Sequence, residues 1–327
     1  MGKTTLAASL ALALAQQGRS VGLLGIDPAR RLRSALGVHE LDDQPARVEG
    51  VGGHLSAAML RPDQTLRRWA AESRATTGGA AELLDNPFFS LIADGLAAST
   101  DTIAAGRIVE WAERSPELDD LIVDTAPGLP ALEFLAKPEK ILAMLGGRLL
   151  GWLGGRHGSA PRFASGLAHL AGVGALAQVA DMVVQMEACL TTFGRRVGVA
   201  RDWFRAGSTQ LIIVAAAERT AECAQLADAL RALGLSPACV VLNRTMPAAL
   251  ETALLAPQND PRVHTQPPRA PDERAFLAWM HTLASQQQRA RHELAQMGVK
   301  LATAPRATID TRNGALVEVG SALLAQL

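Results

Sequence analysis

Gly2-Lys3-Thr4-Thr5, directly after Met1, is the stretch from which the fold of this chain can be predicted. A complete phosphate-binding loop reads G-x-x-x-x-G-K-[ST]: backbone N–H groups surround the phosphates, the Lys contacts the terminal phosphates and the hydroxyl binds Mg²⁺. The chain holds the G-K-T end of this pattern, so the first Gly and the strand before it would lie upstream of Met1. Four common residues are a weak signal, and the rest of the chain has to support it.

The residues after this stretch predict a helix. Residues 4–17 are rich in Ala and Leu, with Leu6, Leu10 and Leu14 spaced four apart, and Gly18 is placed to end the helix. A helix that begins at G-K-T would direct its N-terminal N–H groups and the positive end of its dipole at a phosphate.

Two apolar runs that end in carboxylates predict buried parallel strands. Residues 20–26 end at Asp27, and residues 118–124 end at Asp124. Open α/β sheets bind ligands at the carboxyl ends of their strands. In P-loop ATPases an Asp at the position of Asp124 holds Mg²⁺, whereas the simpler alternative for both side chains is an Asp that caps a turn.

Further strands and helices alternate along the chain. Strands are predicted at 210–216, 239–242 and 299–302, with a return to the sheet within 48–61, and helices at 65–75, 87–100, 220–233 (capped by Thr220), within 272–297, and at 314–327. The Arg-rich residues 29–46 fit either a solvated surface segment or a mobile phosphate-sensing loop. The alternation predicts an α/β fold with a doubly wound, mostly parallel sheet in one P-loop ATPase domain, residues 1–327.

Residues 138–208 differ in composition from the rest. Gly, Ala, Leu, Met and Trp dominate, which predicts an apolar helical insertion within the domain. Its longest apolar run, 141–155, is broken by Arg148 and is shorter than a membrane span. Either these are ordinary core helices, or they expose an apolar surface for a partner or a membrane-protein segment.

Composition narrows the function classes. Lys plus Arg and Asp plus Glu both number 32, so no overall basic field suggests nucleic acid, and hydrophobic residues make up 48%, enough for a large core. Cys189, Cys223 and Cys239 are far apart, which predicts small buried side chains in a reducing compartment rather than disulfides or a zinc site. We find no signal peptide pattern and expect a cytoplasmic protein.

Together, the motifs resemble the ArsA and tail-anchored-protein-targeting ATPase family, deviant-Walker-A P-loop proteins related to MinD. The elements that carry the resemblance are Gly2-Lys3-Thr4-Thr5, Asp27-Pro28-Ala29, Asp124-Thr125-Ala126-Pro127 and Val241-Leu242-Asn243-Arg244. The order and separation of these elements match the family well over residues 1–138, and the last predicted strands extend the match to about residue 247. The apolar region and the C-terminal third match only in general character.

The resemblance implies ATP and Mg²⁺ as cofactors. Gly2, Lys3, Thr4 and Thr5 would bind the phosphates, with Lys3 on the β- and γ-phosphates and Thr4 as a Mg²⁺ ligand.

The same resemblance implies roles for the strand-end residues. Asp27 would orient the attacking water and, with Lys3, form the catalytic pair. Asp124 would hold Mg²⁺ through water, and Asn243 would contact adenine.

The family relation implies a Mg²⁺-dependent ATPase that opens and closes as a homodimer, or as a heterodimer with a paralogue, coupled to a client or membrane-protein partner. Two departures favour an alternative, a non-catalytic nucleotide-sensing or scaffold subunit beside a catalytic paralogue. Residues 128–131 read Gly-Leu-Pro-Ala where the family has Thr-Gly-His-Thr, and the family's signature Lys belongs to the upstream half of the loop. The C-x-x-C that forms a zinc site between subunits in the targeting ATPases is also missing. A chain that begins at Met1 is expected to bind ATP weakly and to fold marginally, because a missing central strand leaves its neighbours unpaired.

Overall fold

The structure is a computed structural model, and it describes residues 2–27, 31–77, 100–125, 188–189, 191–206, 209–256, 271–306 and 314–327. Several predictions therefore lie outside the described residues. They are the Pro-Ala part of the Asp-Pro-Ala element, the segment after Thr125 with its Gly-Leu-Pro-Ala sequence, nearly all of the helix expected at 87–100, and most of the insertion expected at 138–208.

The strands form a mostly parallel α/β structure, as predicted, but in two sheets. They are β1 (Ser20–Gly25), β2 (Ala46–Arg47), β3 (His54–Met59), β4 (Asp120–Asp124), β5 (Leu211–Ala215), β6 (Pro237–Thr245) and β7 (Lys300–Pro305). The sheet orders are β2-β3-β1-β4 and β5-β6-β7, and β2 with β3 is the antiparallel pair. Within the described part of the chain, β4 pairs only with β1 and β5 only with β6. Since β4 and β5 are not joined, the continuous sheet expected from the sequence is divided between them.

The helices are α1 (Lys3–Gln16), α2 (Arg31–Leu36), α3 (Pro62–Thr77), α5 (Thr100–Arg114), α9 (Thr220–Ala232), α10 (Ala248–Leu255), α11 (Pro271–Ala295) and α12 (Gly314–Leu324), and residues 191–205 are also helical. The sequence had predicted α1, α3, α9, α11 and α12. It missed α2, α5 and α10. In α5 the charged residues Arg107 and Glu110 are buried among apolar ones, which obscures the apolar period.

The predicted cap of α9 is wrong. The residue at the N-cap position is Arg219, so Thr220 is already the first helical residue. The hydroxyl of Thr220 donates to Glu293 of α11 instead. The Thr220 side chain thus makes a tertiary hydrogen bond rather than the helix-capping bond that its position in the sequence predicted.

Helices cover both faces of the first sheet, as expected for a doubly wound fold. Successive strand residues point to opposite faces, and β1 follows this rule. Leu23 packs with Leu12 of α1 in one cluster, whereas Leu24 packs with Ile103 and Trp111 of α5 in another. Because both faces are covered, β1 is apolar along its whole length, as its sequence predicted.

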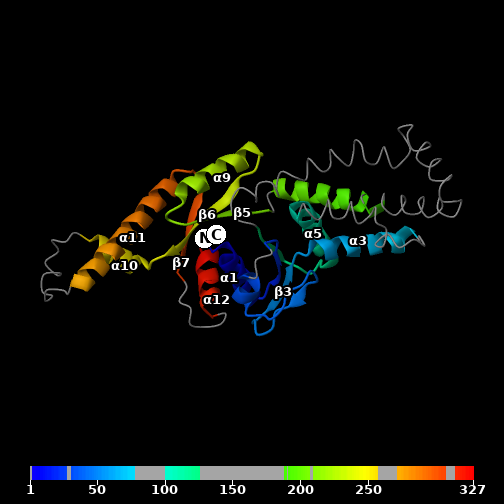
Figure 1. Ribbon diagram of the computed structural model, residues 1–327, viewed down its shortest axis with the longest axis horizontal. Helices are drawn as coiled ribbons and strands as arrows, with labels where there is room; N and C mark the ends of the chain where they lie inside the picture. Colours follow the sequence, from blue (N-terminus) through cyan, green and yellow to red (C-terminus); the bar gives the residue numbers. More distant parts are fainter. Residues whose placement is uncertain are drawn as a thin grey trace, which may run out of the picture.

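Helix α1 also connects the two sheets. Leu6 and Leu10 pack with Val241 of β6 in a cluster that also takes in Ile122 of β4 and Val214 of β5. The opposite side of α1 packs on the first sheet. Figure 1 shows α1 near the centre of the chain, beside α12, with α10 and α11 at one end and α3 and α5 toward the other. The helix that begins at the G-K-T stretch is therefore the central packing element.

Helix α12 approaches α1 so closely that Gly320 is required at the contact. A Cβ on Gly320 would fall far inside contact distance of the backbone oxygen of Ser9, and Ser9 is completely buried. Backbone atoms of a helix cannot move aside as a flexible side chain can. The side-chain-free face of Gly320 is what allows the C-terminal helix to lie on α1.

We expect Gly320→Ala to lower the free energy of unfolding by about 1–3 kcal/mol, because the added methyl group forces α12 away from α1. Urea denaturation of both proteins measures this difference. The matched control is Ser321→Ala, which changes the next residue on the exposed side of α12 and should alter stability by less than about 0.5 kcal/mol. Equal stability of the two variants would contradict the close contact.

Candidate phosphate-binding site

The N-terminus of α1 is built to bind an anion. Gly2 precedes the helix in the left-handed region, with φ 82° and ψ 22°, and the first helical hydrogen bond runs from the Leu6 N–H to the Gly2 oxygen, at 3.0 Å. The N–H groups of Lys3, Thr4 and Thr5 come before that bond and have no acceptor within the helix. Together with the positive end of the helix dipole, they favour a phosphate at this point.

Asn243 lies directly against Gly2, although the two are far apart in sequence. Its amide nitrogen occupies the space that a Cβ on Gly2 would need, and the positive φ of Gly2 also favours glycine at this position. The next residue, Arg244, has φ 60°, and its N–H donates to the Asn243 side-chain oxygen at 2.9 Å. A positive φ is costly for a residue with a side chain, and such positions are found preferentially at functional sites. The end of β6 thus presents Asn243 to the start of α1.

The two strand-end carboxylates reach the same edge of the first sheet. β1 and β4 are parallel, Gly25 is paired with Asp124, and the Ile26 N–H donates to the Asp124 backbone oxygen at 2.9 Å. Asp27 follows one residue later. The Asp124 residue is buried, whereas Asp27 is partly exposed. This is the arrangement that the parallel-sheet prediction required of these residues.

Lys3, at the N-terminus of α1, interacts electrostatically with both of these carboxylates. Burial lowers the pKa of Lys3 below its ordinary value of 10.5, and the nearby charges of Asp124 and Asp27 act in the opposite direction. The ammonium group therefore lies close enough to both carboxylates to interact with them. One cation beside two carboxylates leaves a net negative charge, which a divalent cation would offset.

The side chains present fit Mg²⁺ and nucleotide phosphates. Thr4 and Asp124 supply hydroxyl and carboxylate oxygens, the hard ligands that Mg²⁺ prefers. The ammonium of Lys3 and the N–H groups of α1 suit phosphate oxygens. Thr4 is partly exposed and Thr5 is exposed at the start of α1. The structure thus brings together Gly2, Lys3, Asp27, Asp124 and Asn243, and their individual roles remain predictions.

The three cysteines are buried and have free thiols, as expected from their spacing. Burial raises the pKa of Cys189 to about 11 and raises those of Cys223 and Cys239 as well. The thiols are therefore protonated at neutral pH, which leaves them unreactive as nucleophiles.

Sequence reasoning missed a group of buried charges next to this edge of the sheet. Asp43, Arg107 and Glu110 are all completely or almost completely buried. The signal that could have revealed two of them is the phase of α5, where Arg107 and Glu110 fall on the same face as Ile103 and Trp111. Charged residues at apolar positions of a helix indicate buried partners elsewhere.

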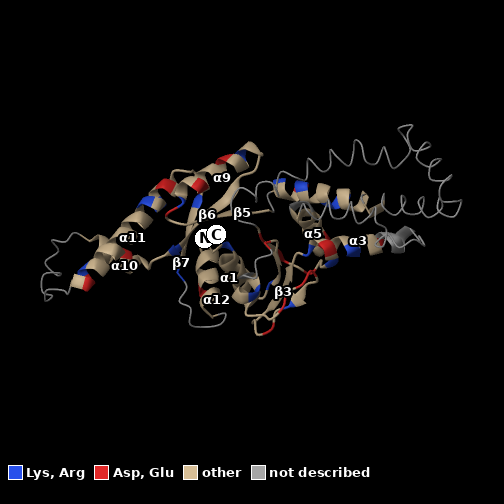
Figure 2. Cartoon of the chain, viewed as in Figure 1, with Lys and Arg blue, Asp and Glu red and all other residues tan. Residues whose placement is uncertain are grey.

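Charge on the described surface is mixed in sign. Figure 2 shows Lys and Arg interspersed with Asp and Glu along α9 and α11. None of the helices in the described ranges has the length and apolar character needed to cross a membrane.

Comparison with known proteins identifies a family and several relatives of the chain. The model of a family described as anion-transporting ATPase, ArsA, matches residues 1–259. The protein "ATPase GET3" of Malassezia globosa is 30% identical over 138 residues, which cover 42% of this chain and 39% of that protein. The proteins of the same name from Mycosarcoma maydis and Pyricularia oryzae are 30% identical over 156 residues and 31% over 179 residues, covering 45% and 48% of their lengths. The chain thus aligns with less than half the length of each of these relatives.

Proposed function

Because the chain belongs to the ArsA family of anion-transporting ATPases, we propose that it binds Mg²⁺ and ATP at the N-terminus of α1 and hydrolyses the ATP. The observation that carries this proposal is the position of Lys3, at the start of a buried helix and within range of both Asp27 and Asp124. Phosphoryl transfer to water depends on positioning and charge neutralisation, and these residues are the groups that provide both.

Each residue has a defined task in the proposed reaction. Lys3 and the N–H groups of α1 bind the phosphates, and Asn243 contacts the base. Thr4 and Asp124 hold Mg²⁺, which neutralises charge on the phosphate oxygens when bound. Asp27 accepts a hydrogen bond from the attacking water and orients it toward the terminal phosphate.

We propose further that the chain acts in the cytoplasm as a dimer, with itself or with a paralogue, and that nucleotide turnover drives its opening and closing on a client or membrane-protein partner. The family relation supports this proposal, and the names of the relatives support the ATPase activity on which it depends. Light scattering after size-exclusion chromatography, with and without nucleotide, tests the dimer. A mass that remains that of one 34.4 kDa chain at all concentrations would exclude the homodimer.

The decisive variant for hydrolysis is Asp27→Asn. We expect it to reduce turnover by about 100-fold or more while ATP affinity changes little, because the amide keeps the size of the side chain but is an uncharged and therefore weaker hydrogen-bond acceptor for the attacking water. A phosphate-release assay measures turnover and isothermal titration measures binding.

The control is Asp120→Asn, at the opposite end of β4, where the carboxylate pairs with Arg19 at the surface. Its turnover should equal that of the parent. Normal turnover in Asp27→Asn would show that the assignment of Asp27 is wrong. Binding without turnover in the parent would favour the nucleotide-sensing alternative.

A further inference from the structure

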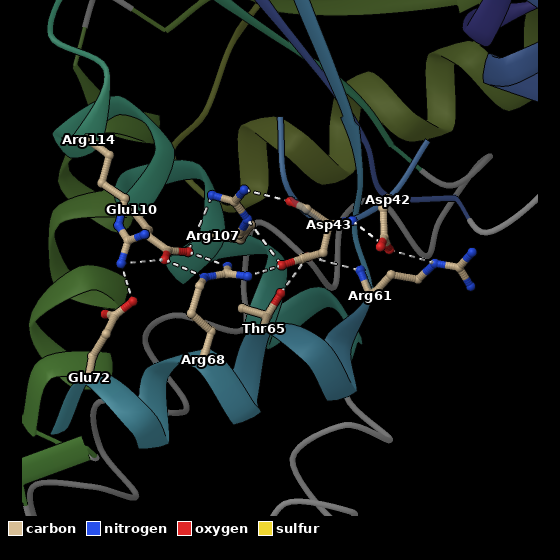
Figure 3. Close-up of polar contacts among 9 residues, drawn as sticks. All are labelled: Asp42, Asp43, Arg61, Thr65, Arg68, Glu72, Arg107, Glu110 and Arg114. Carbon is tan, nitrogen blue, oxygen red and sulfur yellow. Dashed lines mark hydrogen bonds and ion pairs between the residues drawn. The ribbon is translucent and has the colours of Figure 1, made fainter. Parts of the chain in front are cut away.

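The buried carboxylate of Asp43 connects the segment after Asp27 to α3. Asp43 lies between α2 and β2, and its Oδ1 accepts hydrogen bonds from the Arg61 N–H at 3.1 Å and the Thr65 hydroxyl at 2.6 Å. Its Oδ2 accepts from Arg68. Figure 3 shows the carboxylate above the first turns of α3, from which Thr65 and Arg68 rise toward it. An acidic group at a helix N-terminus is also favoured by the helix dipole.

A second arginine connects the same residue to α5. Arg107 Nη2 donates to the backbone oxygen of Asp43 at 2.7 Å. Both arginines then bind one further carboxylate: Arg68 donates to the two oxygens of Glu110 at 3.0 and 2.9 Å, and Arg107 Nη1 lies 3.3 Å from Glu110. Figure 3 shows Arg68 and Arg107 between the two acids. We call Asp43, Arg68, Arg107 and Glu110 the Asp43 cluster.

The cluster continues to the helical residues 191–205. The participating side chains beyond the cluster are Glu72, Glu113, Arg114, Arg195 and Arg196. Arg196 is almost completely buried, lies 3.5 Å from Glu113 and stacks over the Trp69 ring at 5.4 Å. Buried charges thus join α3 and α5 to the loop that contains Asp43, and the partly exposed Glu72 and Glu113 extend these contacts to residues 191–205.

Asp43 lies at the same edge of the sheet as the phosphate-binding site. The Met59 N–H donates to the backbone oxygen of Asp42 at 2.8 Å, and the Leu60 N–H donates to that of Gly25 at 2.9 Å. Since β3 is the neighbour of β1, the loop with Asp43 lies beside the strand end that leads to Asp27. The segment 27–43 therefore has one end in the proposed site and the other in the Asp43 cluster.

The cluster has a second arrangement within reach. Arg107 Nε is buried without a hydrogen-bond partner and lies 3.8 Å from Asp43 Oδ2, the oxygen that Arg68 now binds. An approach of about 1 Å would give this pair an ordinary hydrogen-bond length. Burial lowers the pKa of Arg107, which indicates that its charge is incompletely compensated as it stands. A small movement of Asp43 toward Arg107 would therefore place Arg107 Nε on the oxygen that Arg68 binds.

Stability alone does not explain such a cluster, because buried ion pairs can often be replaced by apolar side chains without loss. We propose that Asp43 is a positioning residue that couples the segment after Asp27 to α3, α5 and residues 191–205, through exchange of Arg68 for Arg107. This inference rests on the proposed nucleotide site. It adds the residues through which that site would act on the three helices, namely the contiguous network of the Asp43 cluster.

Hydrogen exchange with and without Mg²⁺ and a non-hydrolysable ATP analogue tests this coupling. In the parent, nucleotide should slow exchange in α1, which reports binding, and change exchange in α3 and α5, which reports coupling. In Asp43→Asn the protection of α1 should persist, whereas the response of α3 and α5 should fall by about fivefold or more. The carboxamide binds Arg68 more weakly than the carboxylate does and is a weaker acceptor for Arg107 Nε, although the backbone oxygen of residue 43 still binds Arg107.

Two further variants keep the result interpretable. Thr65→Val removes one hydrogen bond to Asp43 without changing charge, and should reduce the response of α3 and α5 partly, even if Asp43→Asn folds poorly. Glu251→Gln is the matched control, since it neutralises a buried carboxylate bound to Gln287 and Arg291 in another part of the chain, and should keep the full response.

Equal responses of α3 and α5 in the parent, Thr65→Val and Asp43→Asn would overturn the coupling role. So would protection of α1 in the parent with no change in α3 and α5. Loss of the α3 and α5 responses in Glu251→Gln would show that neutralising any buried carboxylate removes them. That result would also overturn the coupling role of Asp43. If α1 in the parent is not protected at saturating nucleotide, the proposed site itself fails and the coupling fails with it.

Discussion

Lys3→Met is expected to weaken binding of Mg²⁺ and ATP by about 10- to 100-fold and to reduce turnover at least as much. A hydrogen bond to a charged group contributes about 1.5–3 kcal/mol, and every 1.4 kcal/mol is about tenfold in affinity. Lys3 is the cation at the start of α1, and its charge already lies near Asp27 and Asp124. Without it, these carboxylates would repel the phosphates. Isothermal titration and phosphate release measure the two effects.

The matched control is Lys300→Met. Lys300 begins β7, and its ammonium donates to the backbone oxygen of Leu327 at 2.8 Å. Lys300 lies at the N-terminal end of its strand, whereas the proposed site lies at the carboxyl ends of the strands. Removal of this charge should therefore leave ATP affinity unchanged within about twofold. Equal affinity losses in both variants would mean that overall charge, rather than the position of Lys3, determines binding.

Ionisation of Lys3 should make both the stability of the fold and its affinity for ATP depend on pH. Burial lowers the pKa of Lys3, so its ammonium loses a proton at a lower pH than an ordinary lysine. Without nucleotide, folding favours the neutral form, and stability therefore rises with pH between the folded pKa and 10.5. Phosphate binding requires the charged form, so ATP affinity should fall as pH rises through that range. Titrations at several alkaline pH values measure this, and Lys3→Met should lack the dependence.

Glu110→Gln is expected to lower the free energy of unfolding by about 3–5 kcal/mol, the range found when one partner of a buried ion pair is removed. The substitution keeps the shape of the side chain but removes a charge that contacts Arg68 and Arg107 directly and Arg114 at 3.4 Å. Arg107 is almost completely buried, so the uncompensated cation would remain without water. Urea denaturation, with m-values compared, measures the loss.

The control for this loss is Asp228→Asn, which breaks the exposed pair with Arg231 and should change stability by less than about 1 kcal/mol. Burial opposes ionisation of Glu110, but Arg68 and Arg107 more than offset it, and the pKa lies below the ordinary 4.5. The contribution of Glu110 is therefore complete above about pH 4.5 and is lost as pH falls through the lowered pKa. A loss near zero for Glu110→Gln would show that the cluster does not hold α3 to α5.

Much of the fold could be predicted because its signals are local. The Ala- and Leu-rich run predicted α1 to within one residue, and Gly18 follows it with φ 85°. Short apolar runs predicted the strands. By contrast, α5 was missed, since its buried face includes Arg107 and Glu110, whose partners lie on other segments. Local patterns cannot show that a charged side chain will be compensated by a distant one.

The sequence by itself determined that a helix starts at Gly2-Lys3-Thr4-Thr5 and that Asp27 and Asp124 reach one edge of a parallel sheet, because both follow from backbone periodicity. Only the tertiary structure decided that Asn243 lies against Gly2, that α12 packs on α1 at Gly320, and that Asp43 joins α3 to α5. These contacts link residues far apart in the chain. They depend on how whole elements pack, and packing is a property of the folded chain as a whole.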